Sequence, residues 1–154
     1  MTTKAAFNAD EWSTVTTAPA LTAMGVAMAD RGGTLRESVS MARAYAEARR
    51  DESGELVREV VSTPPAIDPS GMRSPGDVAR EGADRLREAV TLLEQKATPD
   101  ELADYRRFVI AVAETVAGAH REGGFLGVGG RDVSEREQAA LDEIRATLGV
   151  AAEG

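Results

Sequence analysis

Residues 98–121 read TPDELADYRRFVIAVAETVAGAHR and carry the most complete helical pattern in the chain. Thr98 is a typical N-cap residue, Pro99 suits the first helical position, and Glu101 completes a capping box. Apolar residues then recur at steps of three and four, the spacing of one helix face. They are Leu102, Tyr105, Phe108, Val109, Val112, Ala113, Val116 and Ala117. We therefore predict a long helix over 99–121 at the centre of the fold.

Similar start signals divide the rest of the chain into further helices. These helices are predicted to begin after Asn8, at Pro19, after Thr34, at Gly54, after Ser74 and after Ser134. No strand with a pairing partner is apparent, so we predict an all-α fold. The expected architecture is a compact single-domain helical bundle of about six to seven helices that spans residues 1–154.

Two segments fall outside this helical pattern. Residues 63–75 hold four of the six prolines and predict an extended, Pro-rich connector. Residues 1–7 have no apolar period, which predicts a flexible N-terminus or a docking arm.

Pro19 is the strongest interruption near the N-terminus. Proline lacks a backbone N–H and clashes with the preceding turn of a helix. We therefore expect a short helix that ends before Pro19 and a second one that runs from Pro19 to about Asp30.

The apolar spacing also predicts which residues of two later helices face the core. They are Leu35, Val39, Ala42 and Ala46 in the helix after Thr34, and Ala79, Ala83, Leu86, Val90 and Leu93 in the helix after Ser74.

The composition excludes several functional classes. The 154-residue chain has no cysteine and one histidine. It therefore cannot form disulfides, thiolate metal sites or histidine-rich metal sites. Its net charge of −8 argues against a nucleic-acid partner. No apolar run reaches the ~20 residues of a membrane span, and no signal-peptide core follows Met1. We expect a cytoplasmic protein without membrane insertion.

The segment GGFLGVGG, residues 123–130, is rich in glycine. It could hold a phosphate, but neither a preceding strand nor a following Lys-Ser/Thr pair supports a nucleotide site. Phe125 and Leu126 are large apolar residues within this loop. We favour a role as plugs in the core, and the alternative is a partner-binding patch formed by Phe125 and Leu126.

Candidate catalytic groups are scarce. His120 lies at the edge of the long apolar stripe, where capping or partial packing explains it. The nearest hydroxyl, that of Ser134, is expected to cap the last helix. We therefore predict no catalytic residues and a protein that is not an enzyme.

Acidic residues surround the two glycine turns. Oxygen ligands near a tight turn suit a hard cation such as Ca²⁺ or Mg²⁺. The candidate metal ligands are Asp30, Glu37, Glu122, Asp132 and Glu137. The alternative is that acids in a first helical turn simply complement the helix dipole.

The two turns also resemble each other. Ala29-Asp30 precedes the first Gly-Gly and Glu37 follows it, while Glu122-Gly123 and Glu137 stand in the same order around the second. In this order of an acidic residue, a Gly-Gly turn and a later glutamate, the chain resembles the TerB-like helical family, which is associated with tellurite resistance and stress response. The resemblance implies a compact all-helical fold, an acidic surface able to bind divalent cations, and a scaffold role.

Together these features favour a non-enzymatic helical scaffold or partner-binding module, related to stress, with a protein partner or self-association. The alternative is a protein that binds a divalent cation or a small ligand through the acidic residues around the two Gly-Gly turns. An enzyme that uses carboxylates is the third and weakest hypothesis, because the carboxylates occupy solvated positions.

Overall fold

The computed structural model describes residues 4–29, 35–50, 54–63, 67, 74–117 and 135–149. Within these residues it contains one short 3₁₀ helix and six α-helices, and no strand occurs among them. The elements are η1 (Lys4–Ala6), α1 (Ala9–Ala29), α2 (Leu35–Arg50), α3 (Glu55–Ser62), α4 (Pro75–Lys96), α5 (Pro99–Ala117) and α7 (Glu135–Leu148). The all-α bundle predicted from the sequence is therefore confirmed.

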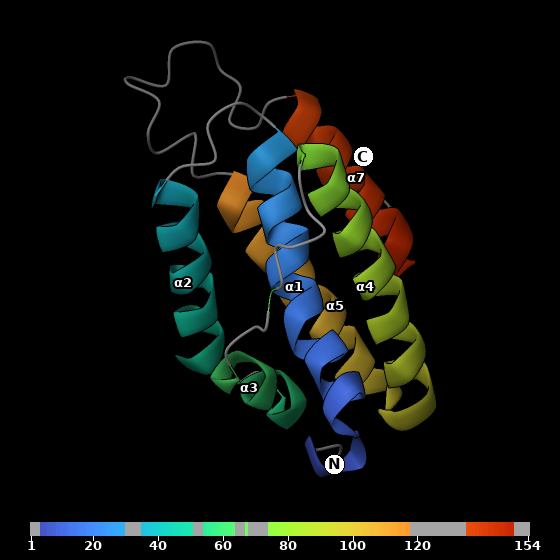
Figure 1. Ribbon diagram of the computed structural model, residues 1–154. Coiled ribbons are helices and arrows are strands. Elements are labelled where there is room, and N and C mark those ends of the chain that lie inside the picture. The colour runs from blue at the N-terminus through green and yellow to red at the C-terminus, as the bar shows by residue number, and fades with distance from the viewer. Residues whose placement is uncertain are drawn as a thin grey trace.

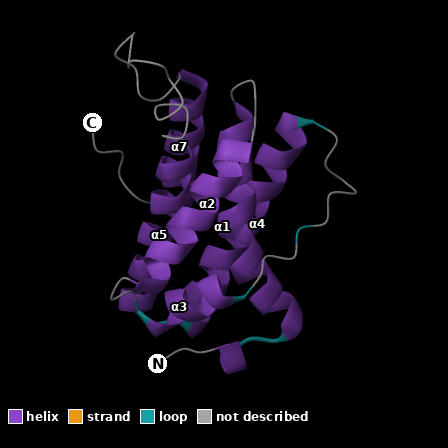
Figure 2. Cartoon of the chain, turned by 90° about the vertical axis from the view of Figure 1, so that its left-hand side faces the viewer, coloured by secondary structure: helices purple, strands orange, loops and turns teal. Residues whose placement is uncertain are grey.

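The long helices run side by side, and the short helix α3 lies at the end of the bundle near the N-terminus (Figures 1 and 2). Helices α1 and α5 each contact every other α-helix in the described part of the chain. All eight residues of the predicted stripe in α5 are buried. The predicted central place of this helix is confirmed and is shared with α1, while residues 118–121 lie outside the described ranges.

Helix α1 is buried on all sides. From Trp12 to Ala27 no residue is exposed, and only Ser13 and Met24 are half-buried. A helix enclosed in this way needs no polar face, because none of its sides meets solvent. Four threonines, Thr14, Thr16, Thr17 and Thr22, are consequently buried together with its apolar residues.

The predicted break at Pro19 is wrong, because α1 continues through this residue. A proline at this position cannot donate to the carbonyl four residues earlier, which is that of Val15. The hydroxyl of Tyr105 on α5 donates to this carbonyl instead, at 2.7 Å. The hydrogen bond that Pro19 removes from the helix is thus replaced by one from a neighbouring helix.

The inward face of α2 also differs from the prediction. Ala42 is exposed and Ala46 is half-buried, whereas Ala44, Tyr45 and Ala48 are buried. The ring of Tyr45 packs edge-on against Phe108 of α5, with centroids 5.3 Å apart. This aromatic contact turns a different side of α2 toward the core from the one that the alanine spacing indicates. The side chains of Leu35 and Val39 are outside the described part.

The predicted helix starts are confirmed at three places. Asn8 and Glu11 form a reciprocal capping box, with backbone-to-side-chain distances of 2.9 and 2.8 Å. Thr98 and Glu101 form a second one. The Ser74 side chain accepts from the backbone N–H of Asp77. These bonds satisfy donors that a helix start otherwise leaves without a partner.

Residues 4–7 follow the docking alternative that the sequence left open. Phe7 is buried, and its ring centroid lies 5.5 Å from that of Trp12. The ammonium group of Lys96 lies 5.6 Å from the centre of the Phe7 ring and donates to the backbone oxygen of Ala6 at 2.9 Å. Of the Pro-rich connector, only residues 63, 67 and 74–75 belong to the described part. None of the helices in this part has the length and apolar character needed to cross a membrane.

Candidate functional site

The site residues predicted from the sequence fall outside what the structure describes. Asp30, Glu122 and Asp132 are outside the described ranges, as are Phe125 and Leu126. Glu37 and Glu137 belong to α2 and α7, but their side chains are outside the description. The structure therefore does not test the predicted metal ligands or the predicted partner-binding residues. Within the described ranges, no three acidic or histidine side chains gather where a metal ion could be held.

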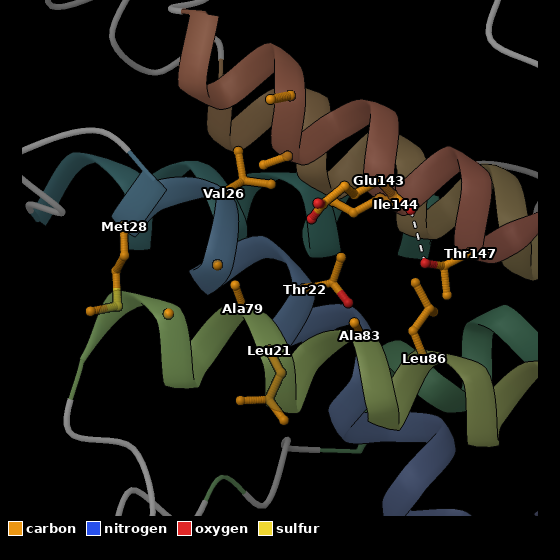
Figure 3. Close-up of a pocket in the computed structure, with 14 residues that line it drawn as sticks. Leu21, Thr22, Val26, Met28, Ala79, Ala83, Leu86, Glu143, Ile144 and Thr147 are labelled. Atoms are coloured by element: carbon orange, nitrogen blue, oxygen red, sulfur yellow. Dashed lines mark hydrogen bonds between the residues drawn. The ribbon is translucent and has the colours of Figure 1, made fainter.

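The structure instead contains a pocket between α1, α4 and α7, which we call the α1–α4–α7 pocket (Figure 3). Its volume is about 310 Å³. The described residues that line it are Leu21, Thr22, Gly25, Val26 and Met28 of α1, Gly76, Ala79, Ala83 and Leu86 of α4, and Ala139, Ala140, Glu143, Ile144 and Thr147 of α7.

Small residues create this space. Helices α1 and α4 approach closely at Gly25, where an added Cβ would lie 3.4 Å from the Cα of Ala79. They do so again at Gly82, where an added Cβ would lie 3.2 Å from the backbone oxygen of Leu21. Glycine is the residue that permits such backbone contact. On the side of this close contact that faces α7, the pocket is lined by alanines, whose short side chains leave space between the helices. They are Ala79 and Ala83 of α4 and Ala139 and Ala140 of α7.

The depth of the pocket can be read from the burial of its walls. Leu21, Leu86 and Ile144 are buried, whereas Ala79 and Ala139 are exposed. The large side chains therefore form the deep part, and the alanines border the opening. The prediction that Ala79 faces the core is wrong, and Ala83 is only half-buried. Leu86, Val90 and Leu93 are buried as predicted, and Val78 and Gly82 take the buried positions expected for Ala79 and Ala83.

Three lining side chains carry polar groups. The hydroxyl of Thr147 donates to the backbone oxygen of Glu143 at 2.8 Å, which is the dashed line in Figure 3. Glu143 is exposed and is the single ionisable residue in the described lining. Thr22 is 6% exposed, and its hydroxyl has no hydrogen-bond partner among the residues that the structure describes.

A threonine in a helix usually donates to the carbonyl three or four residues earlier, as Thr14 and Thr16 do. The hydroxyl of Thr22 makes no such bond. Burial of a polar group without a partner costs stability, and such groups are few in folded proteins. Among the described residues with such a group, Thr22 is the one that also lines the pocket, so a ligand that reached its hydroxyl would supply the missing partner.

A second hollow lies beside Trp12, between η1, α1 and α3. Two of its polar N–H groups are paired across the hollow. The backbone N–H of Lys4 donates to Glu59 at 2.5 Å, and the indole N–H of Trp12 donates to the Thr63 hydroxyl at 3.3 Å. These bonds hold the N-terminal segment against the bundle, so this hollow is part of the packing.

The two buried tyrosines do not supply acid–base chemistry near neutral pH. Burial raises the pKa of Tyr45 to about 12. Burial, with a smaller contribution from Tyr45, raises the pKa of Tyr105 well above its usual 10. Both phenols are therefore protonated at neutral pH, and that of Tyr105 serves as the donor to Val15.

Sequence reasoning missed the α1–α4–α7 pocket because it divided α1 at Pro19 and placed Ala79 and Ala83 in the core. A weak signal was present: glycines at positions 25, 76 and 82 interrupt otherwise helical segments, and glycine there often marks a close backbone approach. No protein-family model, curated protein or solved structure matches this chain.

Proposed function

We propose that the protein binds a small, mainly apolar organic molecule in the α1–α4–α7 pocket. The observation that carries this proposal is a pocket of about 310 Å³ whose lining includes Thr22, a buried residue whose hydroxyl has no hydrogen-bond partner among the described residues. Ligand sites are typically about 300–1,000 Å³, largely apolar, and equipped with a few polar groups that fix orientation. The pocket fits each part of that description.

This proposal takes the small-ligand alternative of the sequence analysis but moves it to other residues. The ligand contacts α1, α4 and α7 rather than the acids around the Gly-Gly turns. The lining supports binding and not catalysis, since no base lies within hydrogen-bond distance of the Thr22 hydroxyl in the described part. The scaffold role implied by the TerB-like resemblance and binding of Ca²⁺ or Mg²⁺ stay predictions, and a thermal melt with and without each cation tests the latter.

Fluorescence titration with 1-aminoanthracene, an apolar aromatic probe, tests the proposal. The key variant is Ala139→Phe, which places a large ring at the opening of the pocket. Ala139 is exposed, so the fold should tolerate the larger side chain. We expect the affinity for the probe to fall at least about tenfold, the scale on which apolar pockets respond to a change in their shape.

Ala146→Phe is the matched control. Ala146 is also an exposed alanine of α7, but it does not line the pocket. This variant should bind the probe like the parent. If the parent does not bind 1-aminoanthracene, or if both variants bind it equally well, the proposal is wrong.

A further inference from the structure

The charge of the lining shows which ligands the α1–α4–α7 pocket can accept. Glu143 is its single ionisable residue among those described, and neither lysine nor arginine appears there. A carboxylate beside an apolar cavity attracts a cation and repels an anion. The net charge of −8 extends this preference over longer distances.

Glu143 lies where the buried wall of the pocket meets solvent. Ile144, the next residue of α7, is buried in the wall, whereas Glu143 itself is exposed. Figure 3 shows the Glu143 side chain among the residues around the pocket, with Thr22 contributed by the opposing helix α1. The apolar part of a ligand can therefore be buried while its charged end stays beside the solvent-exposed carboxylate.

Thr22 supplies a second acceptor. A hydroxyl oxygen has two lone pairs, and neither is used in a bond to a described residue. This oxygen is shielded in the structure rather than exposed in the pocket. Threonine adopts two side-chain rotamers in helices, so rotation about one bond can turn this oxygen toward a ligand. An N–H donor on the ligand would supply the partner that the protein lacks.

We infer that the ligand is a cationic amphiphile, a small molecule with an apolar body and a protonated amine, whose ammonium group is held by Glu143 with Thr22 as second acceptor. This inference rests on the proposed function, because it names the chemical class of the ligand for the same pocket. The same carboxylate disfavours anionic amphiphiles such as fatty acids.

Three probes of equal chain length test the inference: octylamine, 1-octanol and octanoate, each used to displace 1-aminoanthracene at pH 7. We expect octylamine to bind most tightly and octanoate most weakly. Glu143→Gln should weaken octylamine binding by about threefold to fivefold, since Glu143 is exposed and exposed ion pairs are modest. The same variant should leave 1-octanol unchanged. Added salt should reduce the preference for the amine.

Two matched controls separate this effect from general attraction to an acidic protein. Glu94→Gln removes the same charge from an exposed residue of α4 outside the lining and should leave octylamine binding unchanged. Thr22→Val should weaken octylamine about fivefold, the scale of one hydrogen bond, whereas Thr17→Val should not. Thr17 is also buried, and its hydroxyl has no hydrogen-bond partner among the described residues, but it does not line the pocket.

The outcomes distinguish the two proposals. If octanoate binds as well as octylamine, or if Glu143→Gln and Glu94→Gln act alike, the inference about the ligand class is overturned while the pocket remains a binding site. If none of the three probes displaces 1-aminoanthracene and Ala139→Phe also has no effect, the proposed function itself fails.

Discussion

Two of the polar groups that helix α1 carries into the core differ in whether a neighbouring helix supplies a hydrogen-bond partner. Near Pro19, the carbonyl of Val15 loses its helical partner and receives the hydroxyl of Tyr105. One turn further on, the hydroxyl of Thr22 has no partner among the described residues and lines a pocket. A polar group that is paired by a neighbouring helix strengthens the bundle, whereas one left beside a cavity is available to a ligand.

The largest expected effect concerns the hydrogen bond between the Tyr105 hydroxyl and the Val15 carbonyl. Tyr105→Phe keeps the ring but leaves the carbonyl of Val15 buried without its partner. We expect the free energy of unfolding to fall by about 1–3 kcal/mol, the cost of leaving such a group unsatisfied. Urea denaturation followed by circular dichroism measures this difference. A variant as stable as the parent would show that the carbonyl of Val15 does not depend on Tyr105.

A double-mutant cycle tests whether Pro19 and Tyr105 are energetically coupled. In Pro19→Ala, the new backbone N–H can donate to the carbonyl of Val15, so the tyrosine hydroxyl is no longer its single described donor. Tyr105→Phe should therefore cost about 1 kcal/mol less in the Pro19→Ala background than in the parent. Equal costs in both backgrounds would mean that Pro19 and Tyr105 are not coupled.

Removal of the Thr22 hydroxyl should change the free energy of unfolding in the opposite direction. Thr22→Val keeps the shape of the side chain and removes its partnerless hydroxyl, so we expect stability without ligand to rise by about 0.5–1 kcal/mol. Thr17→Val should give a similar gain, because its hydroxyl is also buried and has no partner in the described part of the chain. The same denaturation measurement applies. A loss of stability in Thr22→Val would indicate that its hydroxyl has a partner in the folded protein.

The smallest effect concerns the start of α1, where Glu11 meets Lys96 of α4 at 2.8 Å. Hydrogen bonds from Lys96 and from the backbone of Asn8 hold the pKa of Glu11 below its usual 4.5. A carboxyl with a lowered pKa stabilises the fold above 4.5, and this contribution disappears as the pH falls through the lowered value.

Glu11→Gln should therefore melt slightly below the parent at pH 7, and the difference between the two should vanish in acid below pH 4.5. The amide oxygen of glutamine can still accept from the backbone N–H of Asn8, so the variant tests the charge rather than the cap. Thermal melts at several pH values measure it. A difference that is independent of pH would contradict this assignment.

Several parts of the fold could be predicted because they depend on local signals. Thr98 and Glu101 cap α5 within one turn, and the apolar spacing behind them marks one face. The helix expected from Gly54 onward also occurs, and its apolar residues Leu56, Val57, Val60 and Val61 are buried. Such features need information from only a few neighbouring residues, and the sequence supplies it.

The path of α1 through Pro19 was not predictable in this way. The donor that makes it tolerable is Tyr105, which is 90 residues away from Val15 along the chain. The side of α2 that faces the core is another case, since the contact between Tyr45 and Phe108 outweighs the alanine spacing. Both features depend on contacts between helices that local spacing does not contain.

Local sequence signals were sufficient to predict the helical class, the capped starts of α1, α4 and α5 and the apolar stripe of α5, because helix formation and capping act within a few residues. Packing between helices makes α1 one continuous, largely buried helix, places Ala79 at an opening rather than in the core, and places Thr22 in the lining of a pocket. These properties arise where three helices meet, and the width of the gap between them depends on how closely Gly25 and Gly82 let α1 and α4 approach.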